Sequence, residues 1–406
     1  MARDKSDFFE SKSAHPWSKT KDSLLGCYLK PFFDKTYRAS ADGYIYVDAF
    51  AGPGMYTDGS VGSPILAMQQ LLATARHNPK KHAVQFIFGE ADEESRAELK
   101  ETADKTAGKV RYILPVCICE SSTDALNLAR KMQPCRNRRP ATIFYYVDPY
   151  GVKDLKLELL CQFPNLKHTE ALVNFNTVGF MRDGYDALRI ACELPKGVKV
   201  IDQPFDDNVP MTERIERLNA CIGSDEWQQI LRDKSLSYWE RERQIGRLFC
   251  NNARKCYSYV TNMAIRDMDH MINEGGEIKY RLIHMTNNVD GCLLMNDDML
   301  KRNNDEQVRQ GMLFKVDIDR QEVDPSAIHR YLSDSIAKMP EGRSVKMGVF
   351  AAAVINKYGV FDKSNALLKT YLKPFLDDGT LVREQPRIAT GRACTSFDPK
   401  KTVKKA

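Results

Sequence analysis

The run YIYVDAFAGPG, from Tyr44 to Gly54, constrains the fold more than any other segment of the chain. Residues of high β-propensity precede Asp48, and a glycine-rich turn follows it at once. Gly52 and Gly54 permit tight backbone geometry that other residues rarely adopt. In an open parallel sheet, ligands bind in the crevice beyond the carboxyl ends of the strands. The run therefore predicts a buried strand over 44–48, followed by a turn whose backbone approaches a ligand.

Strand and helix patterns alternate on either side of this run. Short β-prone segments predict strands, and apolar residues at helical spacing predict amphipathic helices between them. This alternation favours a parallel sheet with helices on both faces. Two later strands, with a helix between them, would complete a seven-stranded sheet whose last strand is antiparallel. The predicted strands are 44–48, 84–89, 110–114, 142–147, 171–175, 278–285 and 312–318, and the predicted helices include 62–76, 92–104, 122–132 and 153–162.

Three regions depart from this alternation. Residues from about 180 to 270 are mainly helical and charged, which predicts an insertion that either caps a substrate site or forms a structural layer. Residues 340–395 follow the order helix, turn, helix, strand, which is typical of a winged-helix module. Residues 396–406 form a basic tail, expected to be solvated and disordered. The remaining core, residues 1–335, should fold without the module.

Composition sets broad limits on location and partners. The chain has 406 residues, enough for about two domains. It contains no apolar run near the ~18 residues of a membrane span, and Met1–Lys12 lacks the pattern of a signal peptide. The formal charge of +6 permits nucleic-acid binding without requiring it. Eleven cysteines at irregular spacing predict reduced structural thiols. These features predict a cytoplasmic protein with no membrane partner.

Acidic residues follow three of the predicted strands. Glu90 ends the second strand, where a carboxylate can accept both hydroxyls of a ribose. It follows Asp48 by about forty residues, against the ~20 typical of dinucleotide-binding folds, which disfavours a nicotinamide cofactor. Glu120 follows the third strand, where it would either contact a base or begin a helix. For Glu90 and its neighbour Asp92, a helix-capping role is the alternative.

The sequence Asp148-Pro149-Tyr150-Gly151 ends the fourth predicted strand. Asp148 is the best catalytic candidate, because a carboxylate at this position can orient a nucleophile or accept its proton. Pro149 and Tyr150 complete the predicted catalytic segment, and a structural turn is the alternative.

Several short motifs, taken in order, resemble the three-Cys-motif partner (TcmP) family, which is similar to class I S-adenosylmethionine-dependent methyltransferases. The first motif, Asp48-Ala49-Phe50-Ala51-Gly52-Pro53-Gly54, and the fourth, around Asp148, are the specific ones. The resemblance covers residues 15–310 approximately. The supporting motifs are Gly62-Ser63-Pro64, Phe86-Ile87-Phe88-Gly89-Glu90, Leu172-Val173-Asn174-Phe175 and Met285-Thr286-Asn287-Asn288.

The resemblance implies a Rossmann-like sheet, S-adenosylmethionine as cofactor and a set of site residues. The segment around Asp148 is also similar to the Asp-Pro-Pro-Tyr motif of amino methyltransferases, but it lacks the second proline and has Gly151 after the aromatic residue. The implied cofactor-binding residues are Asp48, Phe50, Gly52, Gly54, Glu90 and Glu120; the implied substrate-binding residues are Lys21, Asn174, Asn176 and Arg182, with Asn287 and Asn288 as weaker candidates.

Three functions remain open from the sequence. The leading one is methyl transfer from S-adenosylmethionine, with a nucleic acid as acceptor. The second is a non-catalytic partner of a neighbouring three-Cys-motif radical or iron–sulfur protein. The third is a phosphoesterase in which Asp48, Glu90 and Asp148 hold a divalent metal, although the glycine turn would then be unexplained. In the predicted winged-helix module, the second helix would contact either a nucleic-acid duplex or a protein partner. The residues available for this contact are Lys363, Ser364, Asn365, Lys369 and Lys373.

Overall fold

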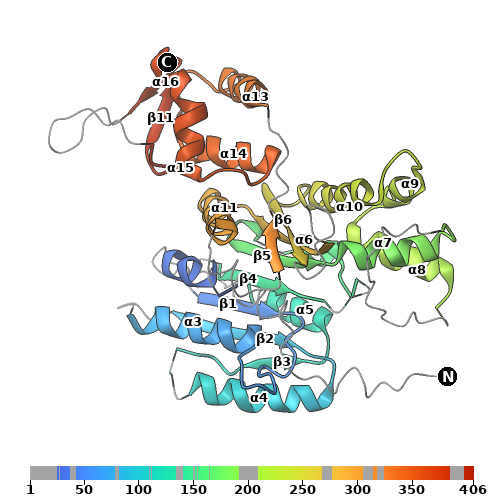
Figure 1. Ribbon diagram of the computed structural model, residues 1–406. Coiled ribbons are helices and arrows are strands. Elements are labelled where there is room, and N and C mark those ends of the chain that lie inside the picture. The colour runs from blue at the N-terminus through green and yellow to red at the C-terminus, as the bar shows by residue number, and fades with distance from the viewer. Residues whose placement is uncertain are drawn as a thin grey trace.

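An eight-stranded mixed sheet forms the centre of the molecule, and a small three-stranded sheet lies in its C-terminal part (Figure 1). The architecture is α/β, with helices on both faces of the large sheet. The computed structural model describes residues 25–26, 28–36, 43–77, 82–108, 110, 112–133, 140–149, 151–152, 154–163, 165–191, 209–267, 277–304, 314–317, 324–384 and 397–406.

The large sheet has the strand order β3-β2-β1-β4-β5-β7-β6-β8. Strands β1 to β5 are parallel to one another, β7 is antiparallel to both β5 and β6, and β8 is antiparallel to β6. The order reverses between β1 and β4, which is where an open α/β sheet binds its ligand. The strands are β1 (Gly43–Asp48), β2 (Ala83–Gly89), β3 (Cys117–Cys119), β4 (Thr142–Val147), β5 (Thr169–Phe175), β6 (Tyr259–Asp267), β7 (Glu277–Thr286) and β8 (Phe314–Asp317).

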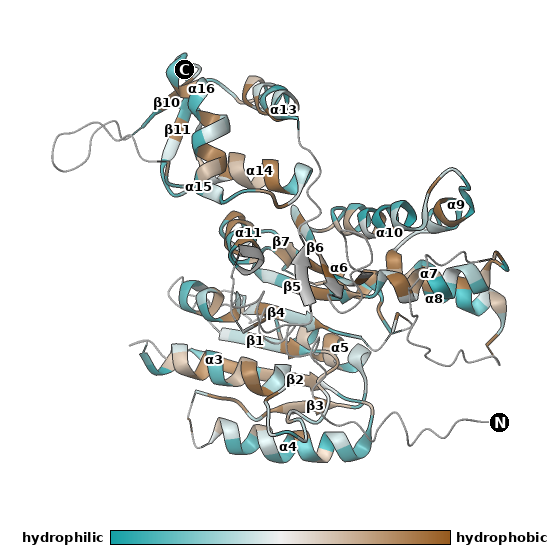
Figure 2. Cartoon of the chain, viewed as in Figure 1, coloured by the Kyte–Doolittle hydropathy of each residue, from teal (hydrophilic) through white to brown (hydrophobic). Residues whose placement is uncertain are grey.

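Two apolar clusters cover the two faces of this sheet. The first contains Tyr46 of β1 and packs under residues 28–36, α3, α4 and α11. The second contains Val47 and packs under α5, α6, α7 and α8 to α10. The outer side of α10 is hydrophilic (Figure 2). The helices are α3 (Ser63–His77), α4 (Glu93–Ala107), α5 (Ser122–Met132), α6 (Leu157–Cys161), α7 (Thr177–Ala187), α8 (Met211–Ile222), α9 (Trp227–Arg232), α10 (Tyr238–Ala253) and α11 (Val289–Asn304), with a 3₁₀ turn η1 (Leu166–His168) before β5.

The third and sixth strands differ from the sequence prediction. The segment predicted as the third strand, 110–114, contributes only an isolated bridge from Ile113 to Val84, and the strand itself begins after Pro115. Proline has no backbone N–H to donate to a ladder, so pairing resumes beyond it. Strand β6 falls inside the predicted helical insertion, where β-branched and apolar residues follow a long charged helix. The sheet therefore has one strand more than the seven predicted.

The C-terminal part of the chain folds as helices on a three-stranded antiparallel sheet of order β10-β11-β9. The tail expected to be solvated forms its central strand, because Val403 is fully buried while the backbone pairs on both sides. Helix α13 also belongs here, since the ring of His329 stacks on Phe375 at 4.7 Å. The elements are α13 (Pro325–Ala337), β9 (Ser344–Lys346), α14 (Gly348–Tyr358), α15 (Ser364–Leu367), the π-helical turn η2 (Leu368–Leu372), α16 (Lys373–Asp377), β10 (Leu381–Arg383) and β11 (Thr402–Lys405).

Asn356 of α14 joins this C-terminal part to the turn between α10 and β6. Its Oδ1 accepts hydrogen bonds from Arg254 Nε at 3.1 Å and from the backbone N–H of Val260 at 2.9 Å. The Nδ2 of Asn356 donates to the backbone carbonyl of Ser258. The backbone carbonyl of Asn356 accepts a hydrogen bond from Arg254 Nη2. The apolar side chains of α14 also enter the first apolar cluster beside those of α11. These contacts favour folding of the C-terminal part together with the core rather than as a separable module.

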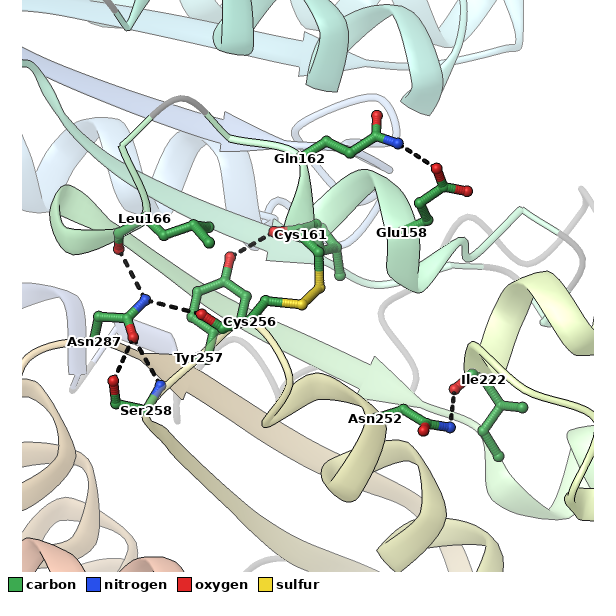
Figure 3. Close-up of a disulfide and its surroundings, with 11 residues drawn as sticks. Glu158, Cys161, Gln162, Leu166, Ile222, Asn252, Cys256, Tyr257, Ser258 and Asn287 are labelled. Atoms are coloured by element: carbon green, nitrogen blue, oxygen red, sulfur yellow. Dashed lines mark hydrogen bonds between the residues drawn. A yellow bond between two sulfur atoms is a disulfide. The ribbon is translucent and has the colours of Figure 1, made fainter.

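A disulfide between Cys161 and Cys256 links the end of α6 to the same turn (Figure 3). The turn is held further by Tyr257, whose hydroxyl donates to the carbonyl of Leu160 at 2.7 Å. The prediction of reduced thiols is therefore wrong for this pair, because residues 95 positions apart in sequence meet at the amino ends of β5 and β6. Five other described cysteines are free: Cys117, Cys119, Cys221, Cys250 and Cys292.

We expect Asn356→Leu to lower the free energy of unfolding by about 2–4 kcal/mol, because it leaves the N–H of Val260 and the carbonyl of Ser258 without their partner. Chemical unfolding in urea measures the loss. Asn365→Leu, at an exposed position on α15, is the matched control and should change stability by less than about 0.5 kcal/mol. Equal effects of the two substitutions would contradict the proposed role of Asn356.

Two buried tyrosines near the disulfide make a second test. Tyr257→Phe removes a hydroxyl that is bonded to a carbonyl, and it should cost about 1–2 kcal/mol. Tyr145→Phe removes a buried hydroxyl that has no hydrogen-bond partner among the described residues, so stability should stay the same or rise. Thermal unfolding of both variants beside the parent gives the comparison, and a reversed order would show that the hydroxyl of Tyr145 is the bonded one.

Candidate functional site

Four polar side chains stand where the central parallel strands end. They are Asp48 in β1, Glu90 directly after β2, Asp148 directly after β4 and Asn174 in β5. Side chains alternate between the two faces of a sheet, and each of the four lies two residues from a side chain of the first apolar cluster. All four are therefore expected on one face, around the point where the strand order reverses. The neighbouring cluster residues are Tyr46, Phe88, Tyr146 and Leu172.

The turn after β1 has the close backbone approach that the sequence predicts. Gly52 and Gly54 have φ of +61° and +82°, in the region that favours glycine. A Cβ at Gly54 would lie 2.8 Å from Leu99 Cδ1, whereas a Cβ at Gly52 would meet no described atom within 4 Å. The N–H of Ala51 donates to the carbonyl of Gly89 at 2.8 Å, which ties the turn to β2. The turn is thus packed at Gly54 and open at Gly52.

Glu90 connects this turn to the end of β2. Its Oε2 accepts from the N–H of Gly52 at 2.8 Å, and its Oε1 accepts from the N–H of Asp92 at 2.8 Å. Asp92 itself caps α4 by accepting from the N–H of Ser95. Asp92 therefore has the capping role, and Glu90 is the carboxylate next to the glycine turn.

Asp48 lies fully buried beneath the turn. Its Oδ2 accepts from the hydroxyl of Ser63 and its Oδ1 from the N–H of Phe50 at 3.3 Å. Burial raises the pKa of Asp48 to about 7; those two hydrogen bonds oppose the shift, while the nearby carboxylates of Asp148 and Glu90 add to it. Asp48 thus holds the start of α3 and the turn in one arrangement.

Asp148 and Asn174 meet side by side at the ends of β4 and β5. Asn174 Nδ2 donates to Asp148 Oδ1 at 2.5 Å, and the hydroxyl of Tyr146 donates to Asp148 Oδ2 at 3.4 Å. Asp148 is half-buried, whereas Asn174 is 6% exposed. Asn174 Oδ1 is buried and has no hydrogen-bond partner among the described residues. The two side chains form a polar pair with its carboxylate reaching the surface.

The remaining predicted residues take other places. Asn176 caps α7 through the N–H of Gly179, and Arg182 pairs with Asp183 at 3.1 Å. Glu120 is exposed after β3, in the register position next to Glu90. Pro149 is buried and Phe50 is half-buried, both at the strand ends described above. Lys21 and Tyr150 lie outside the described residues.

Asn287 and Asn288, the weaker substrate candidates, lie away from the other predicted site residues. Asn287 Oδ1 accepts from the N–H and the hydroxyl of Ser258, and its Nδ2 donates to the carbonyl of Leu166 (Figure 3). Both asparagines follow the end of β7, which is antiparallel to β5. The end of β7 therefore lies at the amino end of β5, across the sheet from Asp148.

Sequence reasoning did not single out Tyr146 and Ser63, which hold Asp148 and Asp48. The alternation of the fourth strand could have found Tyr146, because two residues of separation place it on the same face as Asp148. For Ser63, the only signal was its place in a supporting motif, since its contact with Asp48 depends on how α3 packs.

No group of three or more His, Cys, Asp or Glu side chains within the described ranges is arranged to hold a metal ion. Within the same part of the chain, no helix combines the length and apolar character that a membrane crossing requires.

Comparison with known proteins leaves the family open. No protein-family profile matches the chain, and no curated protein matches it. One similar solved structure is protein LPL1258 from Legionella pneumophila str. Philadelphia 1, described under the family name DUF519. It shares 11% sequence identity at a TM-score of 0.33, over 66% of this chain and 85% of that one. Similarity at this level carries no argument about function.

The buried carboxyl of Asp48 should make stability depend on pH. The folded protein keeps its proton up to pH about 7, whereas the unfolded chain loses it near the ordinary pKa of 3.8. The unfolded state therefore binds fewer protons in this range, and stability from this group falls by about 4 kcal/mol as the pH rises from 3.8 to about 7.

Asp48→Asn should remove this fall in the free energy of unfolding. The stability of the variant relative to the parent should therefore increase as the pH rises to neutral. Urea unfolding at half-unit steps of pH measures it. Asp154→Asn, at an exposed position, is the control. A parallel pH dependence of parent and Asp48→Asn would contradict the assignment.

Proposed function

We propose that the chain binds S-adenosylmethionine at the ends of β1, β2 and β4 and transfers its methyl group to an acceptor. The observation that carries this proposal is the glycine turn after β1, whose Gly52 N–H is bonded to Glu90 at the end of β2. The strand order supports it as well, because β7 is inserted antiparallel between β5 and β6, as in the sheet of class I methyltransferases. The glycine turn lies beside the reversal of strand order between β1 and β4, where such folds bind ligands.

The residues present fit this cofactor. The position above Gly52 is open, so an extended ligand can lie against the backbone there. Glu90 has about four lone-pair positions on its two oxygens, enough to accept two ribose hydroxyls beside its two backbone N–H groups. Glu120, after β3, would lie beside the base of the cofactor. Phe50 lies in the turn itself.

When bound, S-adenosylmethionine supplies an electrophilic methyl group on a sulfonium sulfur. The residues of the chain would contribute proximity and orientation, which account for much of the rate gain in such transfers. Asp48 keeps the turn in place from below, and Asp148 reaches the surface at the end of β4, where it can orient the nucleophile and accept its proton.

We further propose that the acceptor is a nucleic acid, bound with help from the C-terminal part. Its order of helix, strand, two helices and two strands is that of a winged-helix module. The start of α15, which the sequence analysis counted as the second helix of the module, packs on α11, because the N–H and hydroxyl of Ser364 both donate to Asp297 at 2.8 Å. The helix start is thus unsuited to enter a groove. The exposed side chains of Lys363 and Lys369 remain for phosphate contacts, while Lys373 pairs with Asp377.

Titration calorimetry with S-adenosylmethionine and S-adenosylhomocysteine tests the cofactor site. Glu90→Ala should weaken binding about tenfold or more, the loss expected for one charged hydrogen-bonding contact. Glu120→Ala, an exposed carboxylate in the neighbouring register position, should have a smaller effect. Absence of binding by the parent would refute the proposal, and binding without methyl transfer to any acceptor would favour the non-catalytic partner.

A further inference from the structure

The turn between α10 and β6 joins three other parts of the fold within a few residues. Cys256 is bonded to Cys161 at the end of α6 (Figure 3). Ser258 donates to Asn287, after β7, through both its N–H and its hydroxyl at 2.7 Å. The carbonyl of Ser258 accepts from Asn356 of α14, in the C-terminal part. A change at the disulfide therefore acts on the same few residues that hold the C-terminal part.

Asn356 depends on the conformation of this turn for its other hydrogen bonds as well. Its Oδ1 accepts from the N–H of Val260 at 2.9 Å and from Arg254 Nε at 3.1 Å, and its carbonyl accepts from Arg254 Nη2 at 2.8 Å. Arg254 precedes Cys256 in the turn, and Val260 follows it. Displacement of the turn by about 1 Å would lengthen these contacts beyond hydrogen-bonding range.

A second, non-covalent link lies directly beside the disulfide. Leu160 precedes Cys161, Tyr257 follows Cys256, and the hydroxyl of Tyr257 donates to the carbonyl of Leu160 at 2.7 Å. Burial raises the pKa of Tyr257 well above its ordinary value, so this donor keeps its proton. The two cysteines would therefore stay near each other after their bond is cut, at a high effective concentration. Reduction would loosen the turn without separating its two ends, and oxidation would restore the same pair.

The disulfide is open to exchange with a thiol in solution, because both of its cysteines are half-buried rather than enclosed. The five other described cysteines compete poorly for it. Only a thiolate attacks a disulfide, and burial raises the pKa of each of these five thiols. The two that are half-buried, Cys117 and Cys119, lie on β3, and five other strands separate β3 from β6 in the sheet.

We infer that the bond between Cys161 and Cys256 is a reversible redox latch, which sets how tightly the C-terminal part is held against the core. A dithiol supplies the two electrons. One of its thiolates attacks a sulfur of the bridge, the S–S bond breaks, and a mixed disulfide forms. The second thiol of the reductant displaces the chain, which leaves two protonated thiols on the protein and a disulfide on the reductant. An oxidised dithiol reverses these steps, and no cofactor or acceptor is required.

Amide hydrogen exchange of the full-length protein measures the latch where it acts. The protein is equilibrated in mixtures of reduced and oxidised dithiothreitol, and alkylation followed by mass spectrometry gives the state of the two cysteines. A peptide that contains the N–H of Val260, the donor to Asn356, should exchange about tenfold faster in the reduced protein. Peptides from β4, at the centre of the sheet, should exchange equally in both states. Oxidation should restore the slow exchange at Val260.

Serine variants separate the bridge from other effects of the reductant. Cys161→Ser and Cys256→Ser should each show the fast exchange at Val260 without dithiothreitol. Cys117→Ser is the matched control, because Cys117 is a half-buried cysteine that is free. It should keep the redox response of the parent. If neither bridge variant folds, the reduced and oxidised forms of the parent still decide the outcome.

Three results would overturn the inference. If dithiothreitol does not reduce the bond in the folded protein, the bridge is a permanent structural bond. If the bond is reduced but exchange at Val260 is unchanged, the turn does not transmit the change to the C-terminal part. If exchange rises equally at Val260 and in β4, the bond contributes only to the stability of the whole fold.

Discussion

Burial of the central strands on both faces is the constraint on which the rest of the structure depends. Strands β1, β4 and β5 contribute alternate side chains to the two apolar clusters, and nearly every residue within them is buried. Polar side chains can then reach a ligand only where the strands end. This restriction brings Asp48, Glu90 and Asp148 to one edge of the sheet, and it also explains why Asp48, one residue inside its strand, is buried with a raised pKa.

Polar residues that lie deeper in the sheet are closed into networks with their own partners. Arg281 of β7 and Glu242 of α10 form a buried ion pair with distances of 2.7 and 2.6 Å, and Thr177 and Asn262 complete it. Loss of one partner from such a pair typically costs about 3–5 kcal/mol. The network joins the start of α7 to the middle of β7, where Arg281 pairs with Phe175 at the end of β5. It lies on the face of the sheet opposite Asp148.

A second network lies at the amino half of β5. The hydroxyl of Tyr28 donates to Glu170 Oε2 at 2.6 Å, and His284 Nε2 lies 3.2 Å from the same oxygen. Burial, followed by the charge of Glu170, raises the pKa of Tyr28 well above its ordinary value. Residues 28–36 are thereby held against the sheet by a polar contact as well as by apolar packing. Together with Asn356 and the disulfide, this contact ties the amino edge of the sheet to the segments packed around it.

Local sequence determined the parts of this structure that depend on nearest neighbours. The strand over 44–48, the glycine turn, the acids at strand ends and the helices of the C-terminal part follow from alternation, propensity and backbone freedom. Only the tertiary structure decided which ends meet. The bond between Asp148 and Asn174 joins residues 26 positions apart, and the position of Asn287 follows from β7 running against β5. The disulfide between Cys161 and Cys256 likewise depends on contact between segments distant in sequence. The same is true of the central strand formed by residues 402–405. Propensity acts within a few residues of the chain, whereas strand order and hydrogen-bond pairing arise from burial of the whole sheet, so the sequence by itself could place the carboxylates at strand ends but could not pair them.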